Sequence, residues 1–189
     1  MSKRQKMPSG AKRVFKGEIF EVWQWDQNMY DGSTETFERL RRDNTTQVIA
    51  TVGDTIMLQM QEQPDSFGPF QSLPGGRLNE GEYPIEGAKR ELLEETGYMS
   101  DDWTLFREDD PVGKIEWTVY TYIARNCTYR KAPELDPGEK IETKTVSFDE
   151  FLTLTDDPEF YGRELKEILL RARFVPKERE SLHAAIFGV

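Results

Sequence analysis

The chain has 189 residues and a formal net charge of −10, from 25 basic and 35 acidic side chains. This length suits one domain with a well-buried core. The negative charge argues against a nucleic-acid-binding surface, which needs clustered basic side chains to neutralise phosphates. No apolar run has the length of a membrane span or a signal peptide. Because Cys127 is the single cysteine, no internal disulfide can form, and we expect a cytoplasmic protein.

The N-terminal part of the sequence divides into a basic leader and an aromatic hairpin. Residues 1–13 are polar and basic, and we expect them to be disordered. Residues 14–42 read as strand, turn and strand. Trp23 and Trp25 are two positions apart on the first of these strands, so both side chains face the same way. The apolar surface of this hairpin exceeds what one small domain needs and predicts a homodimer interface.

The rest of the chain alternates strands with helices, which predicts one α/β domain over residues 14–175 that includes the hairpin. The expected elements, in chain order, are strands at 46–52, 55–61 and 70–73, a helix at 84–96, strands at 103–108, 116–124 and 143–147, and helices at 148–154 and 159–173. Residues 176–189 form a tail for which two interpretations stay open. It is either a further docked helix or a subunit contact.

A proline and a glycine bound the predicted helix over residues 84–96. Pro84 fits its first turn, and Gly97 suits its C-terminal end. One side of the helix is apolar and should pack inward, while a neighbouring acidic edge should face outward to solvent. The acidic edge consists of Glu91, Glu94 and Glu95.

Three carboxylates at positions i, i+3 and i+4 repel one another, and each like-charge pair costs an isolated helix about 0.2–0.5 kcal/mol. A divalent cation would compensate for this repulsion, because Mg²⁺ is commonly held by one or two carboxylates together with substrate phosphates. The alternative interpretation is a solvated acidic face. A zinc site with several histidine ligands is excluded, because His183 is the only histidine in the sequence.

The segment from residue 76 to residue 98, GRLNEGEYPIEGAKRELLEETGY, closely resembles the Nudix box. That motif places Gly, Glu, Arg-Glu, an aliphatic residue, Glu-Glu and Gly at fixed spacings. Tyr98 departs from it slightly, being aromatic where an aliphatic residue is usual. At average residue usage such a match arises by chance at on the order of 10⁻⁹ per starting position. The matching residues are Gly76, Glu82, Arg90, Glu91, Leu92, Glu94, Glu95 and Gly97.

Membership of the Nudix family would imply an α/β/α sandwich with a mixed sheet and an N-terminal hairpin extension. It also implies a hydrolase that cleaves a nucleoside diphosphate linked to another moiety, with Mg²⁺ or Mn²⁺ as cofactor. Arg90 and Glu94 are expected in the catalytic machinery, Arg90 by orienting the glutamates. The resemblance implies metal ligands from the box and the preceding glycines, namely Glu91, Glu94, Glu95, Glu82 and the carbonyl of Gly75 or Gly76.

Two further segments resemble the ADP-ribose and nucleoside-diphosphate-sugar pyrophosphatases within this family. They are the N-terminal hairpin and the acidic stretch ELDPGEKIETKTVSFDEF. In that subgroup the hairpin helps to form a dimer, and a loop outside the box contributes the general base. Among Glu134, Asp136, Glu139 and Glu142 we favour Glu139, because a Pro-Gly turn directly precedes it and can project its side chain.

Substrate contacts are expected from the hairpin. Arg41 and Arg42 would suit bidentate binding of phosphate, and Trp23 and Trp25 offer stacking platforms for a base. The alternatives are solvated charge for the arginines and core or dimer packing for the tryptophans. One departure from the subgroup lies before the box, where residues 59–63 (QMQEQ) replace a basic pair that is often present.

We therefore predict a Mg²⁺-dependent enzyme that cleaves ADP-ribose or a related nucleoside diphosphate sugar to a nucleoside monophosphate and a sugar phosphate. Its partner is a small-molecule nucleotide rather than nucleic acid or a membrane. One alternative is a Nudix hydrolase of dinucleoside polyphosphates or nucleoside triphosphates. Another is a non-catalytic sensor of nucleotide sugars, against which the intact box glutamates argue.

Overall fold

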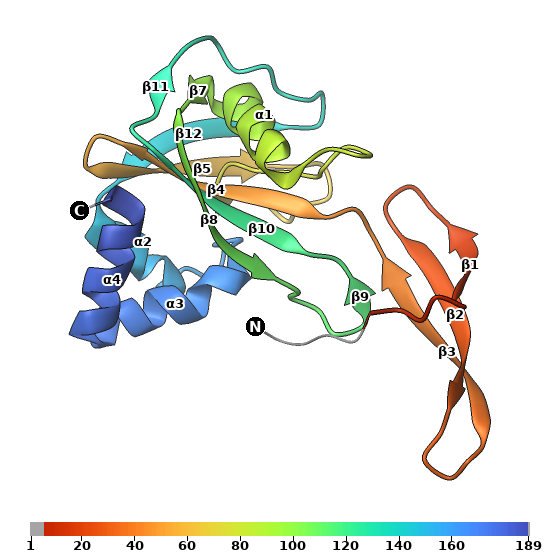
Figure 1. The fold of residues 1–189 in the computed structure, drawn as a ribbon. Coiled ribbons are helices and arrows are strands. Elements are labelled where there is room, and N and C mark those ends of the chain that lie inside the picture. Colours follow the sequence, from red (N-terminus) through yellow and green to blue (C-terminus); the bar gives the residue numbers. More distant parts are fainter. Residues whose placement is uncertain (1–5, 189) are drawn as a thin grey trace.

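A six-stranded mixed sheet forms the centre of the molecule (Figure 1). The computed structural model describes residues 6–188, so the start of the predicted leader, residues 1–5, lies outside the described residues. The order is β12-β5-β4-β10-β8, with β6 paired to β5; β4 and β10 are parallel and the other neighbours antiparallel. The strands are β4 (Thr45–Val52), β5 (Thr55–Glu62), β6 (Phe70–Ser72), β8 (Asp102–Asp109), β10 (Val119–Arg125) and β12 (Lys140–Val146).

Helices cover both faces of this sheet, which confirms the predicted α/β/α sandwich. One face packs on α1 (Pro84–Thr96) through Val48, Ala50 and Met57. The other face carries Ile49 and Leu58, which are buried against the C-terminal helices. These neighbours in sequence point to opposite faces because side chains alternate along a strand. The C-terminal helices are α2 (Phe148–Thr153), η1 (Leu154–Asp156), α3 (Arg163–Phe174) and α4 (Pro176–Phe187).

The boundaries of α1 agree with the sequence prediction. The helix begins with Pro84 in its first turn and ends at Thr96. Gly97 follows with φ 75° and donates its backbone N–H to the carbonyl of Leu93. This left-handed cap favours glycine. A short pair of strands, β7 (Tyr98–Met99) and β11 (Thr128–Tyr129), extends from this end of the helix.

The N-terminal sheet projects from the sandwich, as Figure 1 shows. The predicted hairpin is present, but the structure corrects its extent, because residues 14–42 contain a further strand. The backbone N–H of Gly17 donates to the carbonyl of Phe20 at 2.8 Å and closes a turn that the sequence pattern did not reveal. The sheet order is β1-β2-β3-β9. Its strands are β1 (Lys12–Lys16), β2 (Glu21–Asn28), β3 (Thr34–Arg41) and β9 (Ile115–Glu116).

The described part of the tail, residues 176–188, contains the docked helix α4. Leu182 and Ile186 on this helix are buried in the same cluster as the core of α3. At the other end of the chain, β1 starts at Lys12, inside the stretch that we predicted as a leader. Within residues 6–188, no helix has both the length and the apolarity that crossing a membrane requires.

Candidate metal and substrate site

The three box glutamates differ in burial, which corrects the outward-facing acidic edge that the sequence predicted. The Glu94 side chain is 39% exposed and that of Glu91 is 13% exposed. Glu95 is only 4% exposed. Glu95 follows Ala88 by seven residues, which is close to two helical turns, so the two side chains point in nearly the same direction. Glu95 therefore belongs to the packed side of α1 rather than to its solvent edge.

The carboxylate of Glu95 is held by two donors inside the protein. Its Oε2 accepts hydrogen bonds from the Gly75 backbone nitrogen at 2.8 Å and from Gln59 Nε2 at 3.0 Å. Burial nevertheless raises the pKa of Glu95 to about 8, since these bonds only partly offset desolvation, and the charges of Glu91 and Glu139 raise the pKa further. A cation beside Glu95 would favour the ionised form. The residue thus fits a metal ligand better than a solvated surface charge.

The loop before the box runs between β4 and the glutamates of α1, close to both. Gly75 has φ 150°, and a Cβ atom there would lie 2.2 Å from the carbonyl oxygen of Thr46. A Cβ atom on Gly76 would lie 2.5 Å from Oε1 of Glu91. Gly76 thus lies against the carboxylate of Glu91, and Gly75 contacts that of Glu95 through its backbone nitrogen, where a carbonyl ligand is expected.

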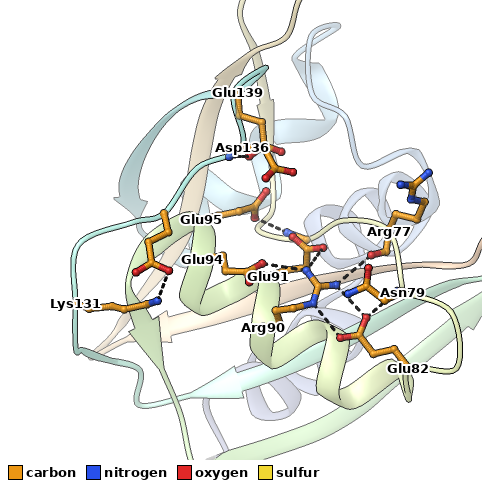
Figure 2. Close-up of polar contacts among 12 residues, drawn as sticks. Arg77, Asn79, Glu82, Arg90, Glu91, Glu94, Glu95, Lys131, Asp136 and Glu139 are labelled. Atoms are coloured by element: carbon orange, nitrogen blue, oxygen red, sulfur yellow. Dashed lines mark hydrogen bonds and ion pairs between the residues drawn. The ribbon is translucent and has the colours of Figure 1, made fainter.

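Arg90 organises the outer half of the site, as Figure 2 shows. Its Nε and Nη2 donate to the two oxygens of Glu82 at 2.9 and 3.0 Å. Its Nη1 donates to Glu91 at 2.9 Å and to Glu94 at 3.0 Å. The paired guanidinium lowers the pKa of Glu82. Glu82 is thereby committed to supporting Arg90, and Arg90 holds Glu91 and Glu94 in fixed positions.

The donor set of this site suits a hard cation. Within residues 6–188, no three His, Cys, Asp or Glu side chains are gathered closely enough to hold a metal ion by themselves. Mg²⁺ needs only one or two protein carboxylates, because water and substrate phosphates complete its octahedral shell. Burial raises the pKa of Glu91 as well, although Arg90 opposes the shift. A divalent cation would therefore stabilise the ionised forms of the buried Glu95 and the partly buried Glu91.

The acidic loop after β11 is anchored to the end of α1. The backbone nitrogen of Glu134 donates to the Glu94 carbonyl at 2.7 Å, and that of Arg130 donates to the Gly97 carbonyl at 2.8 Å. Figure 2 shows Glu139 beside Glu95, at the opposite end of the cluster from Glu82. The turn between Asp136 and Glu139 is closed by a backbone hydrogen bond of 2.9 Å. The Pro-Gly turn thus directs Glu139 towards the box.

The other acidic candidates of this loop lie differently. Glu134 forms an ion pair with Lys131 at 2.7 Å. Glu142 is exposed on β12, opposite Met60 of β5. The negative charge of Glu139, by contrast, raises the pKa of both Glu91 and Glu95.

A cavity of about 570 Å³ adjoins the glycine loop. The guanidinium of Arg42 stacks on Trp117, with its carbon 4.7 Å from the ring centroid, and burial lowers the pKa of Arg42. Phe70 and Tyr161 pack together on the cavity wall with their ring centroids 5.7 Å apart. The lining residues include Arg42, Gln47, Gln61, Gln63, Ser72, Gly75, Gly76, Trp117 and Tyr161. This cavity combines aromatic rings, a cation and neutral hydrogen-bonding groups.

Of the predicted substrate-binding residues, only Arg42 lines this cavity. Trp23 and Trp25 lie on β2 of the projecting sheet, with the guanidinium groups of Arg41 and Arg39 each 5.7 Å from an indole ring. The structure thus separates Trp23, Trp25 and Arg41 from the box of the same chain. Trp117 and Tyr161 were not predicted, because nothing in the sequence shows that segments so far apart meet at one cavity.

Known proteins share this sequence pattern and fold. The family model described as NUDIX domain matches residues 41–167. A methanol dehydrogenase activator of Bacillus methanolicus is 26% identical over 156 residues, covering 80% of this chain and 83% of the relative. An ADP-ribose pyrophosphatase of Bacillus subtilis (strain 168) is 26% identical over 155 residues, covering 79% and 83%. A crystal structure of an ADP compounds hydrolase has the same fold, with a TM-score of 0.71, 20% identity and coverage of 95% and 98%.

Proposed function

We propose, from the premise that this chain belongs to the NUDIX domain family, that it hydrolyses ADP-ribose or a related nucleoside diphosphate sugar with Mg²⁺ as its cofactor. The prediction of a Nudix hydrolase is confirmed by the family match. The observation that carries the proposal is the buried carboxylate of Glu95 beside the partly buried carboxylate of Glu91, both next to Gly75 and Gly76 at the edge of a cavity of about 570 Å³. The similarity to an ADP-ribose pyrophosphatase supports the substrate class.

Nudix hydrolases generally depend on a divalent metal. Glu91 and Glu95 would hold the cation here, with Glu94 and the backbone of Gly75 beside them. A bound Mg²⁺ would neutralise pyrophosphate oxygens and lower the pKa of a coordinated water. Arg90 would keep Glu91 and Glu94 in place through the hydrogen bonds at 2.9 and 3.0 Å. In this arrangement the box glutamates bind the cation and Arg90 orients two of them.

Glu139 is assigned the role of the general base that accepts the proton of the attacking water. Its carboxylate lies beside the box glutamates, yet it is not locked by an arginine as Glu82 is. A carboxylate in this position can accept the proton while the water attacks phosphorus in line with the leaving phosphate. Cleavage between the two phosphorus atoms yields a nucleoside monophosphate and a sugar phosphate.

The organic part of the substrate is assigned to the cavity beside the glycine loop. The Trp117 and Tyr161 rings offer flat apolar surfaces for a base or a sugar, and Arg42 offers a cation for a phosphate oxygen. Gln63 adds a neutral amide whose donors and acceptor suit hydroxyl groups. A nucleoside diphosphate sugar contains all of these chemical groups.

We expect the products to identify the substrate class. The enzyme is incubated with Mg²⁺ and a panel of ADP-ribose, sugar nucleotides, dinucleoside polyphosphates and nucleoside triphosphates, and the products are separated by chromatography. Hydrolysis of ADP-ribose or a sugar nucleotide to a nucleoside monophosphate and a sugar phosphate is the expected result, and Glu91→Gln is the inactive control. Preference for triphosphates with release of pyrophosphate would contradict the proposal.

Replacement of Glu139 should separate catalysis from binding. Glu139→Gln is expected to lower kcat by about 10²–10⁴-fold, because the amide cannot accept the proton. KM should change little, since Glu139 does not line the cavity. The matched control is Glu142→Gln, which removes an exposed carboxylate three residues away on β12. A larger loss in Glu142→Gln than in Glu139→Gln would move the role of the base to Glu142.

We also propose that the enzyme is a homodimer formed through the N-terminal sheet. Four large apolar residues are exposed on it and its first turn, namely Val14, Phe15, Ile19 and Phe20. Such a patch usually marks an interface. Sedimentation at micromolar concentration should give a dimer, and Phe15→Glu should weaken it by about tenfold or more. Leu170→Glu, which alters an exposed apolar residue on α3, is the control; a monomeric wild-type protein would refute the dimer.

A further inference from the structure

Three glutamines form a directional chain of hydrogen bonds that ends on Glu95. Gln63 Nε2 donates to Gln61 Oε1 at 3.4 Å, and Gln61 Nε2 donates to Gln59 Oε1 at 2.6 Å. Gln59 Nε2 then donates to Glu95 Oε2 at 3.0 Å. Gln59 and Gln61 are two residues apart on β5, so the strand points their side chains the same way, and Gln63 comes directly after the end of this strand.

The inner part of this hydrogen-bond chain lies in the core, where an apolar side chain would be easier to bury than an amide. Gln59 is 0% exposed, and Gln61 and Ser72 are also buried. A buried amide is unfavourable unless its donors and acceptors are paired. The neighbours of Gln59 along the first half of β5, Met57 and Leu58, are apolar and fully buried. The polar residues at this depth therefore indicate a requirement other than packing.

The ionised form of Glu95, which a metal ligand requires, fixes the direction of the whole hydrogen-bond chain. An ionised carboxylate offers only acceptors, so Gln59 then turns its NH₂ group towards Glu95. The carbonyl oxygen of Gln59 then faces Gln61, which must present its own NH₂ group. Ser72 completes the arrangement, because its Oγ accepts from Gln61 at 2.6 Å and donates to Gln59 Oε1 at 3.3 Å. Each amide orientation follows from the preceding one.

The two ends of the hydrogen-bond chain lie in different environments. Gln61, Gln63 and Ser72 line the cavity of about 570 Å³, whereas Glu95 is enclosed between α1 and the sheet. Gln59 and the Gly75 nitrogen bind the same carboxylate oxygen of Glu95, Oε2. This arrangement leaves Oε1 as the oxygen that can face a cation. A neutral donor stabilises the ionised carboxylate without placing a competing positive charge beside a metal.

We propose that Gln59 is the positioning residue of the metal site and that Gln61, which does not touch Glu95, supports it from the cavity side. Gln59 holds Oε2 of Glu95 so that the other oxygen points to the cation, and Gln61 keeps the Gln59 amide from turning over. The inference rests on the metal site proposed above. It assigns a task to residues that neither the box motif nor the cavity chemistry accounts for.

The test is the affinity of the substrate-free protein for Mn²⁺, measured by electron paramagnetic resonance of the free ion at one fixed pH. Gln59→Met keeps the side-chain length but removes both donors and the acceptor. We expect it to weaken Mn²⁺ binding by about tenfold, as the loss of a hydrogen bond to a charged group would. Gln61→Met should weaken binding by about threefold, although this side chain does not touch Glu95.

Gln47→Met is the matched control. Gln47 is also a buried glutamine of the central sheet, 8% exposed, and it lines the same cavity, but its Nε2 donates to Thr121 Oγ1 at 2.8 Å. Its replacement should leave the Mn²⁺ affinity within about twofold of the wild-type value, because its side chain bonds to Thr121 and Glu164 and not to the hydrogen-bond chain that ends on Glu95. An equal loss in Gln47→Met and Gln59→Met would attribute the effect to general packing and overturn the proposal.

A double-mutant cycle with Glu95→Gln separates positioning from structure. If Gln59 acts through Glu95, Gln59→Met should weaken Mn²⁺ binding no further once Glu95 is an amide. Additive losses would overturn the proposal, and so would wild-type affinity in both Gln59→Met and Gln61→Met. If Gln59→Met does not fold, Gln61→Met alone decides. Absence of Mn²⁺ binding by the wild-type protein would instead refute the metal site itself, which distinguishes that failure from failure of the positioning role.

Discussion

The burial of the Glu95 carboxylate is the constraint on which the rest of the site depends. Removing an ionised carboxylate from water costs several kcal/mol even after the protein relaxes. Gln59 and the Gly75 nitrogen offset part of that cost, and the remainder is seen in the raised pKa of Glu95. A divalent cation would supply the missing compensation. The proposed metal site is therefore built around a carboxylate whose ionised form is poorly stabilised without a cation.

Several parts of the fold serve this one group. The helix α1 turns Glu95 inward because the residue lies two turns after Ala88, and the glycine loop is held against Thr46 of β4 by a 2.9 Å backbone hydrogen bond from Thr46 to Gly76. The loop that carries Glu139 is fixed to the C-terminal end of α1. Sheet, helix and loop thus meet at the same carboxylates. A shift in any of them would change the distances on which metal binding and proton transfer depend.

The sequence predicted what depends on local patterns. Pro84 and Gly97 marked both ends of α1, and the box spacing identified its glutamates. The burial of Glu95 was missed because the carboxylates were placed together on one edge, although the helical angle of Glu95 lies beside that of Ala88. The cavity could not be predicted, since Arg42, Trp117 and Tyr161 come from three separate segments. Trp23 and Trp25 do lie on one strand, as predicted, but that strand belongs to the projecting sheet and not to the cavity.

The most direct test of a buried charge that needs a cation is thermal unfolding against pH, for the wild-type protein and Glu95→Gln, with and without Mg²⁺. Folding raises the pKa of Glu95 from its ordinary value of 4.5 to about 8, so the folded protein binds this proton more tightly than the unfolded chain does. The resulting stabilisation of the folded state is fully present below pH 4.5 and is lost as the pH rises to about 8. Without metal, the wild-type Tm should fall across this range relative to that of Glu95→Gln, and Mg²⁺ should restore it only in the wild-type protein. Parallel pH profiles, or equal stabilisation of both proteins by Mg²⁺, would contradict this account.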